Sequence, residues 1–423
     1  MGKNEDAWDI LFAEHGVLDK IRSNGKFEIK SIDINRIRQS RLMTKFDHRA
    51  NLPEIFRKNK LAILPVTRGS YVISDFEAYL TQYYDRTLDA EDFEFPSRIE
   101  SLAPSHIYSE AAAINAAYIS GMIDEIVGEK IRPTVSGRMG TSRFGFRINS
   151  MTHPKIHEVL VDNCQCEIDG GFEGDGTLAI IEAKNAISED FIIRQLYYPY
   201  RLWSEKIRKR VIPIFLSYSN DVFHFFVYEF KEAGDYNSIQ LAFQRNFSFA
   251  PEKISMDDLN RILDRVAITE EPKEPFPQAD RFERVVDLLG LLAGGVTDGA
   301  AITRNYDFDP RQTFYYTSAC RYLGLLEGED GQYSLTRRAV QILRLGFKSK
   351  YLALSECILA HEVFNKTFRL YLQEARRPES EDVIEIMKSG NLHGIGSDST
   401  YRRRAQTVIA WAEWVFALQS SAG

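Results

Sequence analysis

The alternation of hydrophobic and polar positions predicts a small unit of mixed helix and strand at the start of the chain. Residues 27–34 and 60–66 alternate or run apolar as strands do, and residues 68–74 follow as another short strand. Residues 109–127 are rich in alanine and place apolar residues at helical spacing, which predicts a buried helix. We therefore expect an N-terminal α+β domain over residues 1–98, followed by a second domain that this helix opens.

The middle of the chain has the most informative pattern. Residues 158–169 and 177–185 have the character of two adjacent strands, joined by the glycine-rich turn GGFEGDG. Residues 188–207 have helical spacing after a serine suited to a helix N-terminus, and residues 211–230 form a hairpin pattern with Ser-Asn-Asp at its turn. This order of strands and helices predicts an α/β domain over residues 99–250.

Helical spacing dominates the remainder. The stretch TEEPKEPFPQAD concentrates acidic residues and proline, so we assign residues 251–280 to a linker. Residues 281–350 have the order helix, helices and turn-containing ribbon that is typical of a winged helix-turn-helix, and residues 351–423 are mostly helical. The predicted fold class is a multidomain α/β (α+β) protein, and its length of 423 residues agrees with two to four domains.

Composition and charge exclude several classes of protein. The chain is 44% hydrophobic and 27% charged with a net charge of −7, which excludes a disordered tail, a collagen-like repeat and a polybasic coat protein. Four cysteines cannot form a disulfide framework at this length, and no apolar run approaches the roughly 20 residues that cross a bilayer. The first residues lack the order of a signal peptide, so we expect a cytoplasmic protein without membrane contact.

The candidate chemistry lies where two predicted strands meet. Asp169 ends the first strand, and Glu182 and Lys184 share one face near the end of the second. If the strands pair around the glycine-rich turn, the two carboxylates converge at one edge of the sheet, where a divalent cation such as Mg²⁺ would relieve their repulsion. Lys184 would then stabilise an attacking hydroxide or the charge that develops on a phosphate, with Glu167 as a further contributor. The alternative is a solvated ion pair at a strand end.

These motifs resemble the PD-(D/E)XK nuclease superfamily, and most closely its type II restriction endonucleases. The resemblance rests on IDGG, on IIEAK and on the helix that follows, although isoleucine stands where the family name has proline. It implies a mixed-sheet catalytic core, with Asp169 and Glu182 as Mg²⁺ ligands and Lys184 as the group that activates water. It also implies roles for Glu110, as an additional acidic residue, and for Gln195, with a tyrosine of the same helix.

A segment rich in glycine and arginine precedes the candidate strands. Arg138, Arg143 and Arg147 lie among three glycines in SGRMGTSRFGFRI, and the alternation in RFGFRI places Arg143 and Arg147 on one face of a strand. Arginine binds phosphate or a guanine edge through two parallel hydrogen bonds, so this segment is a candidate for DNA contact. The alternative is a glycine-bearing hairpin with solvated arginines.

The predicted winged helix supplies a second candidate DNA contact. The N-terminal end of its second long helix would enter the major groove, which points to Arg311, Gln312, Tyr315 and Tyr316. The alternative is a winged-helix module that serves packing or dimerisation.

The expectation that follows is a Mg²⁺-dependent type II restriction endonuclease that hydrolyses double-stranded DNA at specific sites. It would act as a homodimer, because two cuts need two active sites, and would have a DNA methyltransferase as its genetic partner. Two alternatives stay open. One is a nuclease of the same core that acts on branched, damaged or modified DNA, and the other is a non-catalytic winged-helix DNA-binding regulator.

Overall fold

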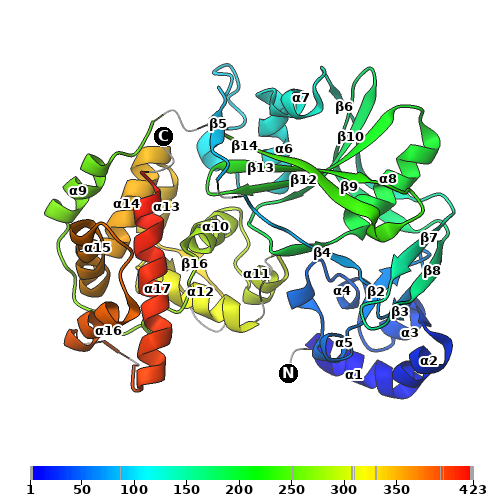
Figure 1. The fold of residues 1–423 in the computed structure, drawn as a ribbon, viewed down its shortest axis with the longest axis horizontal. Helices are drawn as coiled ribbons and strands as arrows, with labels where there is room; N and C mark the ends of the chain where they lie inside the picture. Colours follow the sequence, from blue (N-terminus) through cyan, green and yellow to red (C-terminus); the bar gives the residue numbers. More distant parts are fainter. Residues whose placement is uncertain are drawn as a thin grey trace.

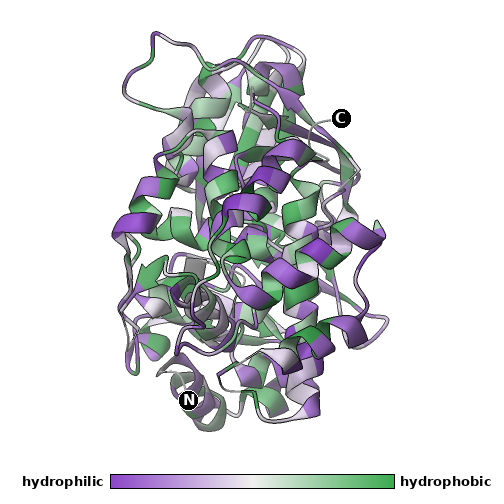
Figure 2. Cartoon of the chain, turned by 90° about the vertical axis from the view of Figure 1, so that its left-hand side faces the viewer, coloured by the Kyte–Doolittle hydropathy of each residue, from purple (hydrophilic) through white to green (hydrophobic). Residues whose placement is uncertain are grey.

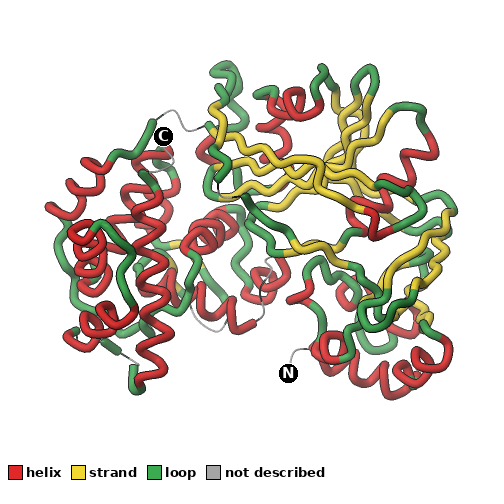
Figure 3. The backbone as a smooth tube through the Cα atoms, in the orientation of Figure 1, coloured by secondary structure: helices red, strands yellow, loops and turns green. Residues whose placement is uncertain are grey.

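The computed structural model describes residues 3–85, 87–249, 252–305, 308, 310–328, 331–390, 392–393 and 395–419. The chain is a mixed α/β protein of several domains (Figure 1). An N-terminal unit lies at the lower right of this view, a large sheet with its helices lies above it, and a helical C-terminal unit forms the left side. Figure 3 shows the same division, with strands concentrated in the two right-hand units and helices in the left-hand one.

The N-terminal unit places short helices around a three-stranded antiparallel sheet of order β1-β3-β2. Its core holds Trp8 and Phe56, whose rings meet edge to face at 4.9 Å between centroids. The alternating burial of β1 follows from its alternating sequence, since successive side chains point to opposite faces of a strand. The elements are α1 (Lys3–His15), α2 (Val17–Asn24), β1 (Phe27–Lys30), α3 (Ser31–Asn35), α4 (Ser40–Met43), α5 (Glu54–Lys58), β2 (Ala62–Pro65) and β3 (Ser70–Ser74).

The central unit is built on a seven-stranded mixed sheet of order β5-β14-β13-β12-β10-β9-β6. Strand β10 runs antiparallel to β9 and parallel to β12, and the remaining long neighbours are antiparallel. The strands are β5 (Ala90–Asp92), β6 (Arg132–Gly140), β9 (Gln165–Glu173), β10 (Thr177–Lys184), β12 (Arg210–Ser219), β13 (Val222–Phe230) and β14 (Ile239–Ser248).

Helices cover both faces of this sheet, so β10 is buried on both sides. Ala179, Ile181 and Ala183 join the hydrophobic cluster formed with α6 (Glu110–Ile119) and α7 (Met122–Val127). Leu178 and Ile180 face the opposite side, which α8 (Arg194–Lys206) covers. A strand that is apolar throughout is expected in such a position, because neither face meets water.

Two short strand pairs connect the central and N-terminal units. The antiparallel hairpin of β7 (Phe144–Asn149) and β8 (Ile156–Val161) buries Phe144 and Phe146 in the same core as the N-terminal helices. Strand β4 (Tyr79–Thr81) pairs with β11 (Asp190–Ile192), which lies between β10 and α8 in the sequence. The two units therefore share a continuous hydrophobic core.

The C-terminal unit is helical, apart from a two-stranded ribbon. Figure 2 views this side of the molecule, where hydrophilic and hydrophobic stretches alternate along the helices, as expected of helices with one buried face. Its core includes Trp411, packed between Phe282 and Phe364. The elements are α9 (Met256–Arg265), α10 (Phe282–Ala293), α11 (Gly299–Asn305), α12 (Pro310–Tyr322), β15 (Leu326–Glu327), β16 (Ser334–Leu335), α13 (Arg337–Leu343), α14 (Phe347–Leu359), α15 (Glu362–Glu374), α16 (Ser380–Ser389) and α17 (Asp398–Ala417).

Several local expectations differ from the structure. The strand expected over residues 27–34 ends at Lys30, where α3 follows. The strand expected over residues 158–169 is two strands of different sheets, β8 and β9, and β9 continues past Asp169 to Glu173. The helix expected over residues 109–127 is two helices, because Gly121 adopts a left-handed conformation with φ of 87° and breaks it. The helix expected to start at Ser188 starts at Arg194, since the preceding residues pair as β11. The stretch assigned to a linker contains α9 and contributes Phe276 to the C-terminal core. A capping box on Ser255 fixes the start of that helix.

Among the described residues, no helix combines the length and apolar character that a membrane span requires.

Candidate active site

The candidate carboxylates lie side by side because of the register between β9 and β10. Gly170 pairs with Ile181, so Asp169 and Glu182 are the next residues on their strands. Asp169 Oδ2 accepts a hydrogen bond from the backbone nitrogen of Ala183 at 2.9 Å, which fixes this carboxylate against the end of β10. The antiparallel pairing thus brings together two acidic residues that are thirteen positions apart in the chain.

Lys184 completes the cluster on the same face of β10 as Glu182. Its Nζ lies 2.5 Å from Glu182 Oε1 and 3.0 Å from the carbonyl oxygen of Ala183. A third carboxylate, that of Glu110, lies 3.5 Å from the same Nζ. The Lys184 side chain is only 12% exposed, so carboxylates rather than water neutralise its charge.

Glu110 reaches the site because α6 begins beside the end of β10. Ser109 caps this helix through a hydrogen bond from the nitrogen of Ala112 to its Oγ at 3.2 Å. The buried alanines of α6 allow the helix to lie close against the sheet. Glu110 therefore occupies the first turn, where its negative charge also interacts favourably with the helix dipole.

Gln195 comes from α8, on the face of the sheet toward which Glu182 points. Its Nε2 donates a hydrogen bond to Glu182 Oε1, whereas its Oε1 is buried and has no hydrogen-bond partner among the described residues. The tyrosines of this helix do not join the site. Tyr198 is buried and donates to the carbonyl oxygen of Pro65, and Tyr200 packs its ring 4.7 Å from that of Phe230.

Burial and like charge both act on the central carboxylate. Burial, reinforced by Asp169 and Glu110, raises the pKa of Glu182 to about 8, and Lys184 only partly opposes this shift. Burial alone would lower the pKa of Lys184, but the surrounding carboxylates hold it well above its ordinary value. The lysine therefore stays positively charged, whereas the raised pKa of Glu182 places its proton exchange near neutral pH.

Two charged residues of this environment were missed by sequence reasoning, Asp47 from the N-terminal unit and Arg194 at the start of α8. Asp47 is buried, and Lys45, Lys184, His48 and Arg194 lower the pKa of its carboxyl group despite its burial, which by itself would raise it. Arg194 has a buried Nε without a hydrogen-bond partner among the described residues. No spacing or alternation in the sequence distinguishes Asp47, because its position depends on a contact between two domains.

The donor set suits a hard divalent cation. Carboxylate oxygens are the ligands that Mg²⁺ prefers, and Asp169 keeps its Oδ1 without a hydrogen bond from the described residues while its Oδ2 is held in place. The buried, unpartnered Oε1 of Gln195 adds a neutral acceptor next to Glu182. Within the described ranges, no three acidic, histidine or cysteine side chains already form a metal-binding group.

The arginines predicted to contact DNA are paired with acidic residues on the surface, and the partner of Arg138, Glu167, lines the same pocket as Glu182 and Gln195. Arg138 pairs with Glu167 at 3.2 Å, Arg143 with Asp162 at 4.0 Å, and Arg147 with Glu232 at 2.7 Å. As expected, the apolar residues between the last two arginines are buried. Exposed ion pairs of this kind contribute little to stability and leave the guanidinium groups accessible to a phosphate.

The residues predicted on the winged helix belong to α12 of the C-terminal unit (Figure 1). Arg311 is exposed, and Gln312 and Tyr315 are half-buried. Tyr316 does not fit the predicted role, because it is buried and its ring stacks on that of Phe308 at 4.7 Å. The helical period places Tyr316 on the inner face of the helix.

Comparison with known protein families divides the chain into three matched segments. Residues 5–73, 74–248 and 284–420 match three family models, each described as a domain of unknown function (DUF6996, DUF6997 and DUF7226, in that order). No curated protein and no solved structure matches the chain. The middle segment contains the sheet and every residue of the carboxylate–lysine cluster.

Proposed function

We propose that this protein is a Mg²⁺-dependent restriction-type endonuclease that hydrolyses phosphodiester bonds in double-stranded DNA at specific sites. The observation that carries the proposal is the cluster at the end of β10, where Asp169, Glu182 and Lys184 lie with Glu110 and Gln195. Two carboxylates and a buried lysine at one edge of a sheet are the groups that metal-assisted attack of water on phosphorus requires.

The topology supports a restriction-endonuclease-like core. Helix α6 precedes β6, β9 and β10, and α8 then connects β10 to the parallel strand β12. These four strands are neighbours in the order β6-β9-β10-β12. This succession of a helix, three antiparallel strands, a helix and a parallel strand agrees with the family that the sequence motifs resemble.

The order of elements in the C-terminal unit supports a winged helix. Helices α10, α11 and α12 are followed by the antiparallel pair β15 and β16, and Asp298 bridges to Gln332 as a third short strand. In this arrangement the exposed Arg311 lies at the start of the helix that would enter the major groove, with Gln312 and Tyr315 beside it. Arg138, Arg143 and Arg147 would contact the DNA backbone from the central unit.

Each residue of the cluster has a distinct role in the proposed reaction. Asp169 and Glu182 would hold Mg²⁺, which lowers the pKa of a bound water and neutralises phosphate charge. The ammonium group of Lys184, kept charged by its carboxylate neighbours, stabilises the attacking oxygen and the negative charge that develops on the phosphate. Gln195 orients Glu182 through the hydrogen bond from its Nε2, and Glu110 holds the position of Lys184.

Digestion of unmethylated phage DNA with Mg²⁺ or with EDTA tests the proposal, for the wild type beside Glu182→Ala. Glu173→Gln is a matched control, because Glu173 is also paired with a lysine, Lys209, at 2.6 Å, and lies on β9 away from the cluster. Discrete Mg²⁺-dependent fragments from the wild type and Glu173→Gln, but not from Glu182→Ala, would support the proposal. A continuous smear would favour a nuclease for branched, damaged or modified DNA, and binding without cleavage would favour a regulator.

A homodimer and a neighbouring methyltransferase complete the proposal. Two cuts in one duplex require two catalytic clusters, so a two-fold dimer on DNA is the expected assembly. Sedimentation of the protein with a DNA fragment that carries its cleavage site distinguishes one bound chain from two. EDTA is added so that the DNA is not cut during the measurement.

A further inference from the structure

The six residues that follow Lys184 are held by an unusual number of separate elements. We define residues 185–190 as the post-catalytic segment. It leaves the candidate site directly, because β10 ends at Lys184. Each of its residues has an anchor elsewhere in the fold, and these anchors are Ile107 O for Asn185, Ser217 Oγ for Ala186, Asp287 for Ile187, Tyr84 Oη for Ser188, Gln82 N for Glu189 and Arg49 N for Asp190.

The N-terminal unit holds the far end of the segment through Asp190. Its two carboxylate oxygens accept hydrogen bonds from the backbone nitrogen of Arg49 at 3.2 and 3.3 Å. His48 Nδ1 lies 2.6 Å from the carbonyl oxygen of Asp190 and 3.5 Å from its Oδ1. Asp190 is buried, so these contacts replace water around its charge.

The C-terminal unit holds the middle of the segment through Asp287 of α10. Its Oδ2 accepts a hydrogen bond from the backbone nitrogen of Ile187 at 3.3 Å, and both oxygens lie 2.9 Å from Ser219 Oγ at the end of β12. The neighbouring Glu189 pairs with Arg281 at 2.9 Å and with Arg284 at 3.4 Å, both from the C-terminal unit. Two successive residues, Glu189 and Asp190, thus bind different flanking domains.

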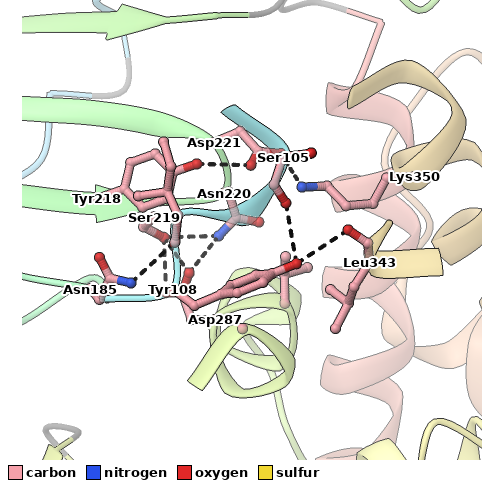
Figure 4. A pocket seen from close by; sticks show the side chains of 13 residues that line it. Ser105, Tyr108, Asn185, Tyr218, Ser219, Asn220, Asp221, Asp287, Leu343 and Lys350 are labelled. Carbon is pink, nitrogen blue, oxygen red and sulfur yellow. Dashed lines mark hydrogen bonds and ion pairs between the residues drawn. The ribbon is translucent and has the colours of Figure 1, made fainter. Parts of the chain in front are cut away.

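A pocket with several polar lining residues lies beside this junction. Figure 4 shows Asp287 next to Ser219 and Asn220, and Lys350 from α14 directed at Asp221 in the turn after β12. The side-chain oxygens of Asn185 and Asn220 are buried there without partners among the described residues. Ala186 of the segment packs into the hydrophobic core of the C-terminal unit, so the geometry of this junction depends on that contact together with a small number of polar bonds.

We propose that Asp287 is a positioning residue. Through Asp287, the way the C-terminal unit packs against the central unit determines the position of Lys184. The inference rests on the proposed nuclease function and deepens it. Ile187 lies three positions after Lys184 in the chain. Strand β10 is paired with β12 up to Lys184, but its pairing with β9 ends at Ile181, so one side of the strand end that carries Lys184 has no strand neighbour among the described residues. When the C-terminal unit shifts on DNA, Asp287 shifts the backbone at Ile187, and the strand end that carries the lysine must follow. Cleavage therefore depends on the domain contact as well as on DNA binding.

The test compares Asp287→Ala with Asp287→Asn and with Asp258→Ala. Asp258 is the matched control, because it is also buried in the C-terminal unit and bonded to a serine hydroxyl, Ser255 Oγ at 2.8 Å, but lies in α9. We expect Asp287→Ala to lower the single-turnover cleavage rate 10- to 100-fold with the DNA dissociation constant changed less than threefold. Asp287→Asn keeps an acceptor for Ile187 and should recover most of the rate, and Asp258→Ala should cleave normally.

Amide hydrogen exchange of the unbound protein gives a readout that is independent of cleavage. We expect faster exchange across residues 185–192 in Asp287→Ala but not in Asp258→Ala. A wild-type cleavage rate in Asp287→Ala, an equal loss in Asp258→Ala, or unchanged exchange in the segment would overturn the inference. If the wild type cleaves no DNA, the proposed function fails, and the exchange pattern alone still decides whether Asp287 orders the post-catalytic segment.

Discussion

Replacement of Asp287 by asparagine should make the protein more stable at neutral pH. Burial raises the pKa of the Asp287 carboxyl from its ordinary value of 3.8 to about 7, although hydrogen bonds from Ser219, Ile187 and Asn220 favour its ionised form. Asparagine has nearly the same shape and keeps one acceptor oxygen, but it carries no charge into the interface between α10 and the sheet. The substitution therefore isolates the cost of ionising this group.

The sign and size of the effect follow from the two pKa values. Between pH 4 and pH 7 the Asp287 carboxyl keeps a proton in the folded protein that it has lost in the unfolded chain. The contribution of this group to the free energy of unfolding is therefore fully present below pH 4 and is lost as the pH rises through 7. A difference of roughly three pKa units, at about 1.36 kcal/mol per unit, corresponds to a loss of about 4 kcal/mol. The Asp287→Asn variant should lack this loss and should gain up to this amount over the wild type at pH 8.

Urea unfolding of both proteins at half-unit steps between pH 4 and pH 8 measures the effect. The difference between the two free energies of unfolding should lie near zero at pH 4 and should rise steadily to pH 7. Other groups that titrate in this range, Glu182 among them, are present in both proteins and cancel in the difference. A difference that stays constant across the whole range would refute the assignment of a raised pKa to Asp287.

Three further outcomes are expected. Lys184→Ala should abolish Mg²⁺-dependent cleavage, with a loss of at least about 100-fold in single-turnover rate and unchanged DNA affinity in EDTA, and cleavage near the wild-type rate would contradict its role. Trp411→Ala should destabilise the C-terminal unit by about 3–5 kcal/mol in calorimetry, because this indole is fully buried and donates to the carbonyl oxygen of Ala279 at 2.6 Å. Asp75→Asn should lower stability at pH 7 but not at pH 2. Burial alone would raise the pKa of Asp75, but hydrogen bonds, among them that with His157, hold this pKa at about 2. The contribution of Asp75 to stability is therefore present above its unfolded pKa of 3.8 and lost toward pH 2. Urea melts in which the variant loses equal stability at both pH values would argue against this.

The local pattern of the chain was enough to predict the strands that carry the candidate site. The apolar run of β10, the glycine-rich turn before it and the alternating burial of β7 are all consequences of near neighbours in the sequence. The same local reasoning failed at Ser188, where pairing of residues 190–192 with β4 overrode helical spacing. It also failed at residues 256–265, where acidic and proline-rich surroundings obscured a short capped helix with one buried face.

The sequence by itself determined which residue types stand at the end of β10, because alternation along a strand assigns Glu182 and Lys184 to one face without knowledge of the rest of the fold. Only the tertiary structure decided what surrounds them. Three interactions join residues more than ninety positions apart. Asp47 interacts electrostatically with Lys184, the backbone of Arg49 in the N-terminal unit bonds Asp190, and Asp287 bonds Ile187. Such contacts depend on how whole domains pack, and periodicity within one segment carries no information about them.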